Sequence, residues 1–127
     1  MRRFSAKEEA RRLVAAPYLA DSVSAPVIGF ENHLNYVYRP NSNLTEDEAV
    51  GLVAIFNSSL LDNYFRVSSG NTQVSANELR AMALPSLQAI QAIGRSVRIA
   101  QFDHDSIDAM VIQLAGSKAE QKVAARG

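Results

Sequence analysis

The sequence predicts an α+β domain, in which a small antiparallel sheet from the first third, with a short central strand, packs against a helix pair and further C-terminal helices. Three observations lead to this fold class. Residues 21–42 are rich in β-branched and aromatic side chains. Two capping boxes open helices in the middle of the chain, and apolar residues recur at helical spacing after them. Strands and helices do not alternate, which disfavours a doubly wound nucleotide-binding sheet.

The first twenty residues allow two interpretations. Ser5-Ala6-Lys7-Glu8 has the pattern of a capping box, and residues 6–16 are rich in helix formers. Alternatively, residues 2–4 and 12–14 form two strands joined by a charged turn. Pro17 argues against a helix that runs further.

Residues 21–42 predict extended structure. Pro26 and Pro40 border a segment of β-forming side chains, and residues 33–38 partly alternate between polar and apolar, as a half-buried strand does. Residues 41–43 are typical of a loop.

A helix pair follows. Residues 45–48 form a Thr-Glu-Asp-Glu capping box whose acidic side chains suit the positive end of a helix. Residues 57–59 predict a break, and a second helix reaches Val67. Gly70 is expected to end this helix in a left-handed conformation.

The remainder predicts one short strand and three helical segments. Residues 72–74 are extended, Ser75 opens a short helical turn, and Pro85 keeps residues 82–84 extended. Helices are expected from Ser86 and over residues 105–114, with Gly116 as a stop. The predicted organisation is one domain over residues 1–116 and a flexible tail over residues 117–127.

Composition sets further limits. The 127 residues suit one domain with a modest core, and the formal net charge is zero. The absence of cysteine excludes disulfides, thiolate zinc sites and cysteine nucleophiles. No apolar run approaches the roughly 20 residues that span a bilayer, and no signal peptide is recognisable. A cytoplasmic location is the default expectation.

Charge is unevenly placed despite the neutral total. Five basic residues crowd the first twelve positions, against Glu8 and Glu9: Arg2, Arg3, Lys7, Arg11 and Arg12. Such a strip can contact phosphate groups on a nucleic acid. A solvated surface without a ligand explains it equally well.

Searches for catalytic and cofactor motifs find little. No glycines stand as Gly-x-Gly, so dinucleotide and phosphate-loop fingerprints are absent. His33 and His104 lack the company of other metal ligands, and helix-end electrostatics explains the acidic residues 46–48 better than a metal does. No catalytic, cofactor-binding or metal-binding residue is predicted in this chain.

Several longer sequence segments carry information when they are taken in order. They are Arg2-Arg-Phe-Ser-Ala-Lys-Glu-Glu9, Arg11-Arg-Leu-Val-Ala-Ala16, Glu31-Asn-His-Leu-Asn-Tyr36, Leu44-Thr-Glu-Asp-Glu-Ala49, Phe56-Asn-Ser-Ser-Leu-Leu-Asp-Asn-Tyr-Phe-Arg66, Ser69-Gly-Asn-Thr-Gln-Val74, Asn77-Glu-Leu-Arg80 and Leu84-Pro85. Together they resemble the carboxy-terminal part of restriction–modification N6-adenine DNA methyltransferases, and the resemblance covers residues 2–97. More distantly, they are similar to the end of each target-recognition domain in type I specificity subunits.

The resemblance implies a DNA-recognition module from a two-part enzyme. In the family, a catalytic domain binds S-adenosylmethionine and flips an adenine, while a target-recognition region holds the duplex and reads its sequence. The catalytic Asn-Pro-Pro-Tyr-type motif and the glycine-rich cofactor loop are missing here. The chain is therefore expected to be a C-terminal fragment without catalytic activity or S-adenosylmethionine of its own. Its expected partners are double-stranded DNA and a catalytic methyltransferase domain or subunit.

The resemblance also favours strands over a helix at residues 2–4 and 12–16. Arginines, amides, a histidine and a hydroxyl become the candidate DNA contacts, because arginine binds phosphate and Asn or Gln can pair with adenine. The candidate phosphate contacts are Arg2, Arg3, Arg11, Arg12, Arg39 and Arg66. The candidates for hydrogen bonds to bases or backbone are Asn32, His33, Asn35, Asn71, Thr72 and Gln73, and the last three compete with a purely structural role in their turn.

A protein-interaction module is the alternative function. The predicted helices over residues 45–67 and 86–114 have wide apolar faces for so small a domain. Such a face can pair with a second copy, giving a homodimer, or with a separately encoded catalytic subunit. Pairing of this kind is insensitive to salt, whereas DNA binding weakens steeply with salt.

Overall fold

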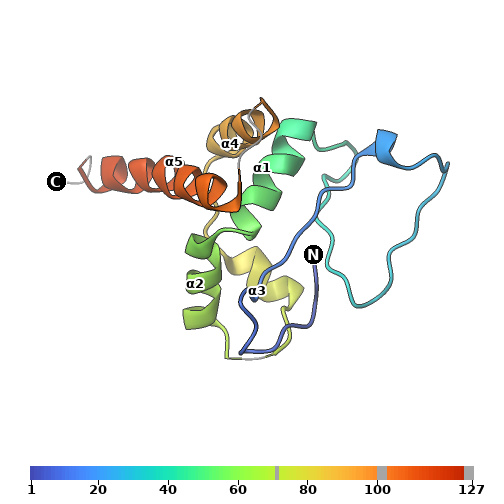
Figure 1. The fold of residues 1–127 in the computed structure, drawn as a ribbon, viewed down its shortest axis with the longest axis horizontal. Helices are drawn as coiled ribbons and strands as arrows, with labels where there is room; N and C mark the ends of the chain where they lie inside the picture. Colours follow the sequence, from blue (N-terminus) through green and yellow to red (C-terminus); the bar gives the residue numbers. More distant parts are fainter. Residues whose placement is uncertain (71, 100–102, 125–127) are drawn as a thin grey trace.

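Helices dominate the chain (Figure 1). A computed structural model describes residues 1–70, 72–99 and 103–124. The helical elements are a 3₁₀ helix, η1 (Ala20–Ser22), and five α-helices, α1 (Glu46–Phe56), α2 (Ser59–Ser68), α3 (Ala76–Ala81), α4 (Leu87–Ile99) and α5 (His104–Ala124).

The described residues do not form the expected antiparallel sheet, so the α+β prediction is wrong. Within the described ranges, the strand pairing consists of two isolated antiparallel bridges, Arg2 with Leu34 and Phe4 with Gln73. A sheet needs consecutive paired residues, whereas residues 1–5 pair at single points with two different segments. The β-forming residues further along have no core to face: Val27 is 83% exposed. The β propensity of a side chain reflects how well it fits a half-buried, packed sheet surface. Because these residues have no such surface to pack against, their β propensity does not produce a strand.

Both interpretations of the first twenty residues are also wrong, since residues 1–19 form neither a helix nor a continuous strand. Glu9, not Glu8, accepts a hydrogen bond from the Ala6 backbone amide, at 3.1 Å. That contact closes a turn in which the Glu9 amide donates to the Ala6 carbonyl.

The two central capping boxes are confirmed. The Thr45 hydroxyl accepts from the Glu48 amide at 3.2 Å, and the Glu48 carboxylate accepts from the Thr45 amide at 2.9 Å. Ser75 and Glu78 repeat this arrangement at α3. Each box satisfies two amides that a helix start would otherwise leave without partners.

Two predicted helix ends differ from the structure. Gly70 does not have a positive φ, and α2 closes instead on Ser69 in an extended conformation. The last helix continues through Gly116 to Ala124. Both differences show that a glycine allows a helix to end at its position but does not force the helix to end there.

The helices α1 and α4 form the principal helix–helix contact, and two glycines allow it. A Cβ at Gly51 would overlap the Ile90 carbonyl, and one at Gly94 would overlap the Asp47 carbonyl. The backbones of the two helices therefore approach closely, with α5 packed across both (Figure 1).

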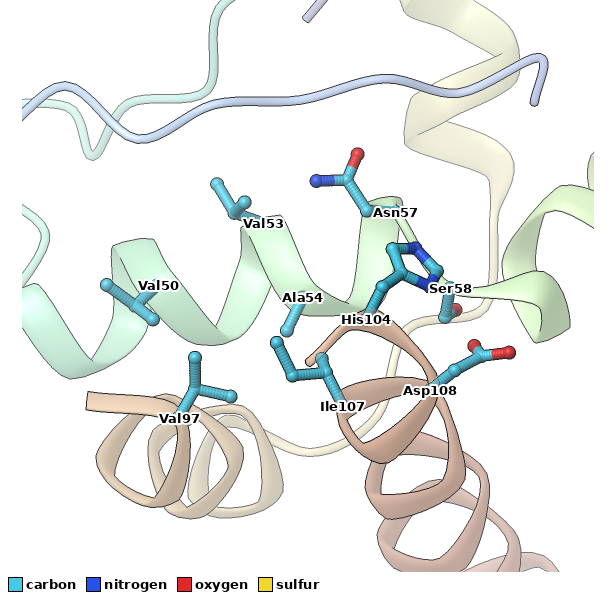
Figure 2. Close-up of a pocket in the computed structure, with 9 residues that line it drawn as sticks. All are labelled: Val50, Val53, Ala54, Asn57, Ser58, Val97, His104, Ile107 and Asp108. Atoms are coloured by element: carbon cyan, nitrogen blue, oxygen red, sulfur yellow. The ribbon is translucent and has the colours of Figure 1, made fainter. Parts of the chain in front are cut away.

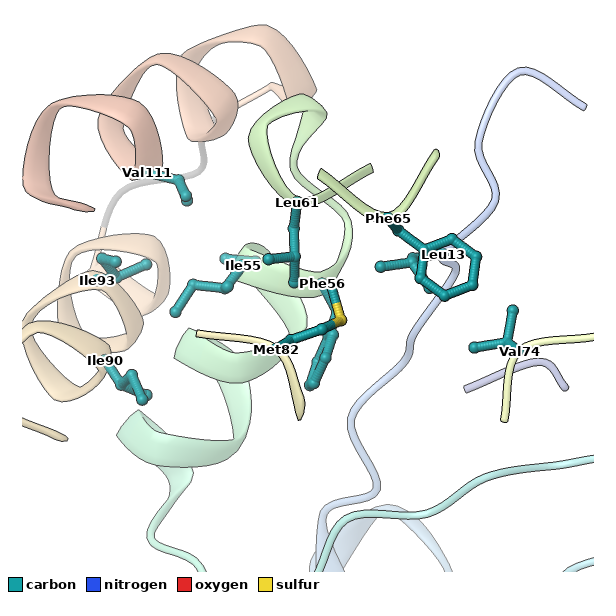
Figure 3. Packing of buried hydrophobic residues seen from close by; sticks show 11 residues of the cluster. Leu13, Ile55, Phe56, Leu61, Phe65, Val74, Met82, Ile90, Ile93 and Val111 are labelled. Carbon is teal, nitrogen blue, oxygen red and sulfur yellow. The ribbon is translucent and has the colours of Figure 1, made fainter. Parts of the chain in front are cut away.

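One apolar cluster joins the helices to the N-terminal segment (Figure 3). Ile93 and Val111 are fully buried at the helical end, and Phe65 of α2 is fully buried beside Leu13 and Val74. Burial of such side chains contributes about 1.5–3 kcal/mol each. Phe65 therefore fixes residues 13 and 74 relative to α2, although neither lies in a regular element. No helix among the described residues has the length and apolarity that a membrane span requires.

Candidate nucleic-acid interface

Residues 1–5 lie beside two segments that are far from them in the sequence, residues 33–35 and residues 72–74. On one side, the Asn35 amide donates to the Met1 carbonyl at 2.9 Å and the Arg3 amide donates to the His33 carbonyl at 2.9 Å. On the other side, the Ser5 amide donates to the Thr72 carbonyl at 3.0 Å. The N-terminal segment therefore lies between residues 33–35 and residues 72–74 and holds both.

Polar side chains gather where these segments meet, and Arg3 is at their centre. Its Nη1 donates to the Asn32 carbonyl at 3.1 Å. The Gln73 side-chain oxygen, in the amide orientation that satisfies both groups, accepts from Arg3 Nε and Nη2 at 3.0 Å each. The His33 ring lies 5.5 Å from the Phe4 ring, centroid to centroid. We call this set the Arg3 surface: Arg3, Asn32, His33, Thr72 and Gln73.

The Arg3 surface has a fixed backbone and accessible side chains. Asn32, His33 and Thr72 are exposed, and Arg3 and Gln73 are half-buried. His33 Nδ1 lies 2.7 Å from a carboxylate oxygen of Glu31, so one acidic group adjoins the surface. Arginine, amide and hydroxyl groups held on fixed backbone suit recognition of phosphates and base edges.

The two other predicted polar contacts, Asn35 and Asn71, are not assigned to the Arg3 surface. Asn35 is half-buried, and its side-chain amide donates to the Val74 carbonyl at 2.8 Å, which links two of the three segments. This bond serves the fold. Asn71 lies outside the described residues.

Arg66 clamps the N-terminal segment onto α2. Its Nη1 donates to the Lys7 carbonyl at 2.8 Å, its Nη2 to the Glu9 carbonyl at 2.6 Å, and its Nε to Asp62 at 2.7 Å. These bonds engage all three nitrogens of the guanidinium. Arg12 is 1% exposed, with its guanidinium carbon 5.2 Å from the Phe65 ring centroid. Both arginines therefore hold the fold together where they stand.

Asp62 accepts the bonds that complete this clamp. Its Oδ1 accepts from the Arg12 amide at 2.6 Å and from the Leu13 amide at 3.3 Å. Burial acts to raise the pKa of Asp62, but the hydrogen bonds from Arg66, Arg12 and Leu13 outweigh it and lower the pKa. The Asp62 carboxylate therefore remains charged in the folded chain at neutral pH.

The other predicted arginines also have partners. Arg2 pairs with Glu9 at 2.5 Å, and Arg39 pairs with Glu48 at 3.0 Å. The bond from Arg39, with those from Thr45 and Gln91, lowers the pKa of Glu48 to about 2. Arg2 and Arg39 are thus neutralised locally.

Arg11 differs, because among the described residues it contacts a carbonyl and a histidine ring and no carboxylate. It donates to the Asn57 carbonyl at 2.5 Å and lies 3.4 Å from His104 Nδ1.

Sequence reasoning missed Asp62 and Asn57, which carry much of the N-terminal attachment. Asn57 accepts from the Ala15 amide at 2.8 Å and donates to the Ala15 carbonyl at 2.9 Å. The i,i+4 spacing of Asp62 and Arg66 is visible in the sequence and predicts their pairing. No sequence signal identifies the distant carbonyls that Arg66 binds.

A small cavity of about 120 Å³ lies among α1, α4 and α5 (Figure 2). Its polar lining is engaged in the fold: Asn57 holds Ala15, and Asp108 accepts from the Ser59 amide at 2.7 Å. Across the described ranges, no three His, Cys, Asp or Glu side chains gather as a metal site would require. The cavity is therefore a packing feature at the junction of the helices.

Comparison with known proteins finds two type II methyltransferases. The chain is 44% identical to methyltransferase M.BsuBI of Bacillus subtilis over 97 residues, which cover 76% of this chain and 19% of that protein. It is 38% identical to methyltransferase M.PstI of Providencia stuartii over 112 residues, which cover 88% of this chain and 22% of that protein. The chain thus spans about a fifth of the length of these relatives and is related to that part of them. No family model and no solved structure matches it.

Proposed function

Proceeding from this relation to type II methyltransferases, we propose that the chain is a DNA-contacting, target-recognition part of an adenine-specific restriction–modification methyltransferase. The observation that carries the proposal is the Arg3 surface, where three distant segments bring five of the predicted contact residues together. Adenine specificity follows from the resemblance of the sequence strings, and catalysis and S-adenosylmethionine binding belong to other polypeptide in this proposal.

Charge at the Arg3 surface supports contact with phosphate. Arg3 forms no ion pair with a described carboxylate, and neither does the exposed Lys7. Arg3 is held by the Asn32 carbonyl and by Gln73, which leaves further N–H donors on the guanidinium for a ligand. A group that is already oriented loses less conformational entropy on binding.

The proposed contact set is narrower than the set predicted from the sequence. Arg3 supplies the phosphate contact, and Asn32, His33, Thr72 and Gln73 supply hydrogen bonds to bases or backbone; Asn71 remains a candidate. Arg11 is a peripheral phosphate contact. The proposal assigns Arg2, Arg12, Asn35, Arg39 and Arg66 to support of the surface, because each is engaged within the fold.

The test is fluorescence anisotropy of a labelled DNA duplex, titrated with the chain at several salt concentrations. Arg3→Ala is expected to weaken binding at least tenfold at low salt. It is also expected to reduce the slope of log K against log salt by about 1, as loss of one phosphate contact does. Arg95→Ala is the control for loss of one positive charge, since Arg95 is an exposed residue of α4 outside the Arg3 surface, where it pairs with Asp47 at 3.5 Å.

Either of two results would contradict the proposal. Absence of binding even at low salt would exclude autonomous DNA contact. An equal effect of Arg3→Ala and Arg95→Ala would show that overall charge, and not the Arg3 surface, attracts the DNA.

A second candidate function rests on the outer face of α2. Leu60, Tyr64 and Val67 follow one another at i, i+4 and i+7 and are 44%, 47% and 91% exposed. A stripe of this kind suits pairing with a second copy. Sedimentation equilibrium would then show a dimer that persists at high salt and that Val67→Ser weakens.

A further inference from the structure

A large aromatic groove lies beside the N-terminal segment. It has a volume of about 890 Å³ and runs between residues 14–21, residues 30–45 and the inner face of α1. We call it the aromatic groove, after four of its lining residues: Tyr18, Phe30, Tyr36 and Tyr38. It is separate from the residues of the Arg3 surface.

The four aromatic rings form a continuous ladder. Tyr18 meets Phe30 edge-on at 6.3 Å between centroids, Phe30 stacks on Tyr36 at 5.7 Å, and Tyr36 meets Tyr38 at 5.7 Å. They remain 42–65% exposed despite these contacts. An exposed apolar surface of this extent is typical of an interaction site.

The backbone beside the ladder has few internal partners. Within the described part of the chain, residues 23–30 and 36–38 form no hydrogen bond. Ordering such a segment costs conformational entropy that its own contacts do not offset. Its free amide and carbonyl groups can pair with an added strand, as in recognition by β-augmentation.

The charge of the groove disfavours a nucleic acid. Its two arginines are neutralised, because Arg2 pairs with Glu9 and Arg39 pairs with Glu48. Asp21 adds one acidic group to the lining, Glu46 pairs with Arg98, and the Met1 ammonium donates to the Asn35 carbonyl. A DNA strand would meet no surplus of positive charge, whereas apolar walls with free backbone groups suit a polypeptide.

The relatives supply a candidate for the polypeptide. Most of each methyltransferase lies outside the part that this chain matches. We propose that the aromatic groove is the docking site for the remaining part of the methyltransferase, which inserts an extended, apolar segment along the aromatic ladder. This proposal rests on the methyltransferase relation and not on DNA binding, so either proposal can fail alone.

The test compares hydrogen exchange of residues 23–30 and 36–38 in two proteins without DNA. One is the 127-residue chain. The other is full-length M.PstI in which this chain replaces the matching segment. Exchange of the segment is expected to be near the unprotected rate in the chain alone and at least tenfold slower in the chimera. If the chimera is insoluble, the same measurement is made on this chain co-expressed with M.PstI lacking its matching segment.

Paired variants locate the contact. Tyr36→Ser in the chimera is expected to restore fast exchange, whereas Leu87→Ser, at an exposed apolar residue of α4, is not. Because Tyr36 is 63% exposed, its replacement should leave the melting temperature of the isolated chain unchanged.

Three results would overturn the proposal. The first is equal exchange of the segment in both proteins. The second is protection in the isolated chain that rises with protein concentration, which would make a second copy the occupant. The third is protection that appears only when a DNA oligonucleotide is added, which would make the ladder a base-stacking platform.

Discussion

Asp62 is the residue on which the N-terminal attachment converges. One carboxylate accepts from two backbone amides and from Arg66, and Arg66 in turn donates to two carbonyls of residues 7–9. Asp62 is 5% exposed, so its removal leaves buried donors without acceptors. Unsatisfied buried donors cost about 1–3 kcal/mol each.

Asp62→Ala is therefore expected to lower the free energy of unfolding by about 3 kcal/mol, measured by urea denaturation. The exposed Asp21 provides the control, and Asp21→Ala should change stability by less than about 0.5 kcal/mol. An effect of Asp62→Ala as small as that of the control would show that the clamp is dispensable.

Glu48 is expected to make stability depend on pH. Its pKa is about 2 in the folded chain, below its ordinary value of 4.5. A carboxylate with a depressed pKa stabilises the fold above pH 4.5, and this contribution is lost as pH falls toward 2. The stability difference between the wild type and Glu48→Gln should therefore shrink over that range in urea titrations. A difference that stays constant from pH 6 to pH 2 would contradict the assignment.

Residue identity made each member of the Arg3 surface a candidate contact, but it did not separate these residues from arginines that are engaged within the fold. Arg3, Arg12 and Arg66 look alike in the sequence, since each is a cation near other polar residues. Burial against Phe65 and bonds to distant carbonyls distinguish Arg12 and Arg66. Both features depend on contacts between residues that lie tens of positions apart, and a local sequence pattern does not reveal such contacts.

Among the elements, helices were predictable because their signals are local. A capping box spans four residues and an apolar face repeats within two turns, so each central helix begins where the sequence predicts. A sheet depends on pairing between remote segments. Residues 1–5 find such partners only at isolated points, and the prediction of a sheet from β-forming residues fails for that reason.

The crossing of α1 and α4 gives a prediction at the element scale. Alanine favours a helix over glycine by about 1 kcal/mol, but a Cβ at position 94 overlaps the backbone of α1. Gly94→Ala should therefore lower the melting temperature, with a net cost of about 1–3 kcal/mol. Gly29→Ala is the control, because a Cβ at Gly29 meets nothing within 4 Å. A stabilised Gly94→Ala variant would mean that the helices are farther apart.

At the scale of the whole molecule, a helical body carries a long irregular excursion on one side (Figure 1). Ordered sequence strings predicted the relation to methyltransferases, and the comparisons support it at the level of type II methyltransferases. The exposed ladder was not predicted. Tyr36 and Tyr38 suggest a core or a sheet face when read alone, and their exposure follows from the missing sheet.

Limited digestion with chymotrypsin should cut this excursion first, after Phe30, Tyr36 or Tyr38, because proteases need an accessible and unpaired backbone. Phe65 is fully buried and should resist. The nicked chain should still elute as one particle in size-exclusion chromatography, since bonds from residues 1–15 reach both sides of the cut. Separation of the fragments would contradict the described attachment.

The placement of residues 1–5 between residues 33–35 and 72–74 has a consequence for biosynthesis. Residues 1–5 leave the ribosome before either of their partners does. They can therefore be fixed on both sides only after residue 74 has emerged, and closing such long loops slows the step. Helices α1 and α2 lie before residue 74 and can begin to form earlier, so within this chain the expected order of cotranslational folding runs from residues 46–68 back to residues 1–5.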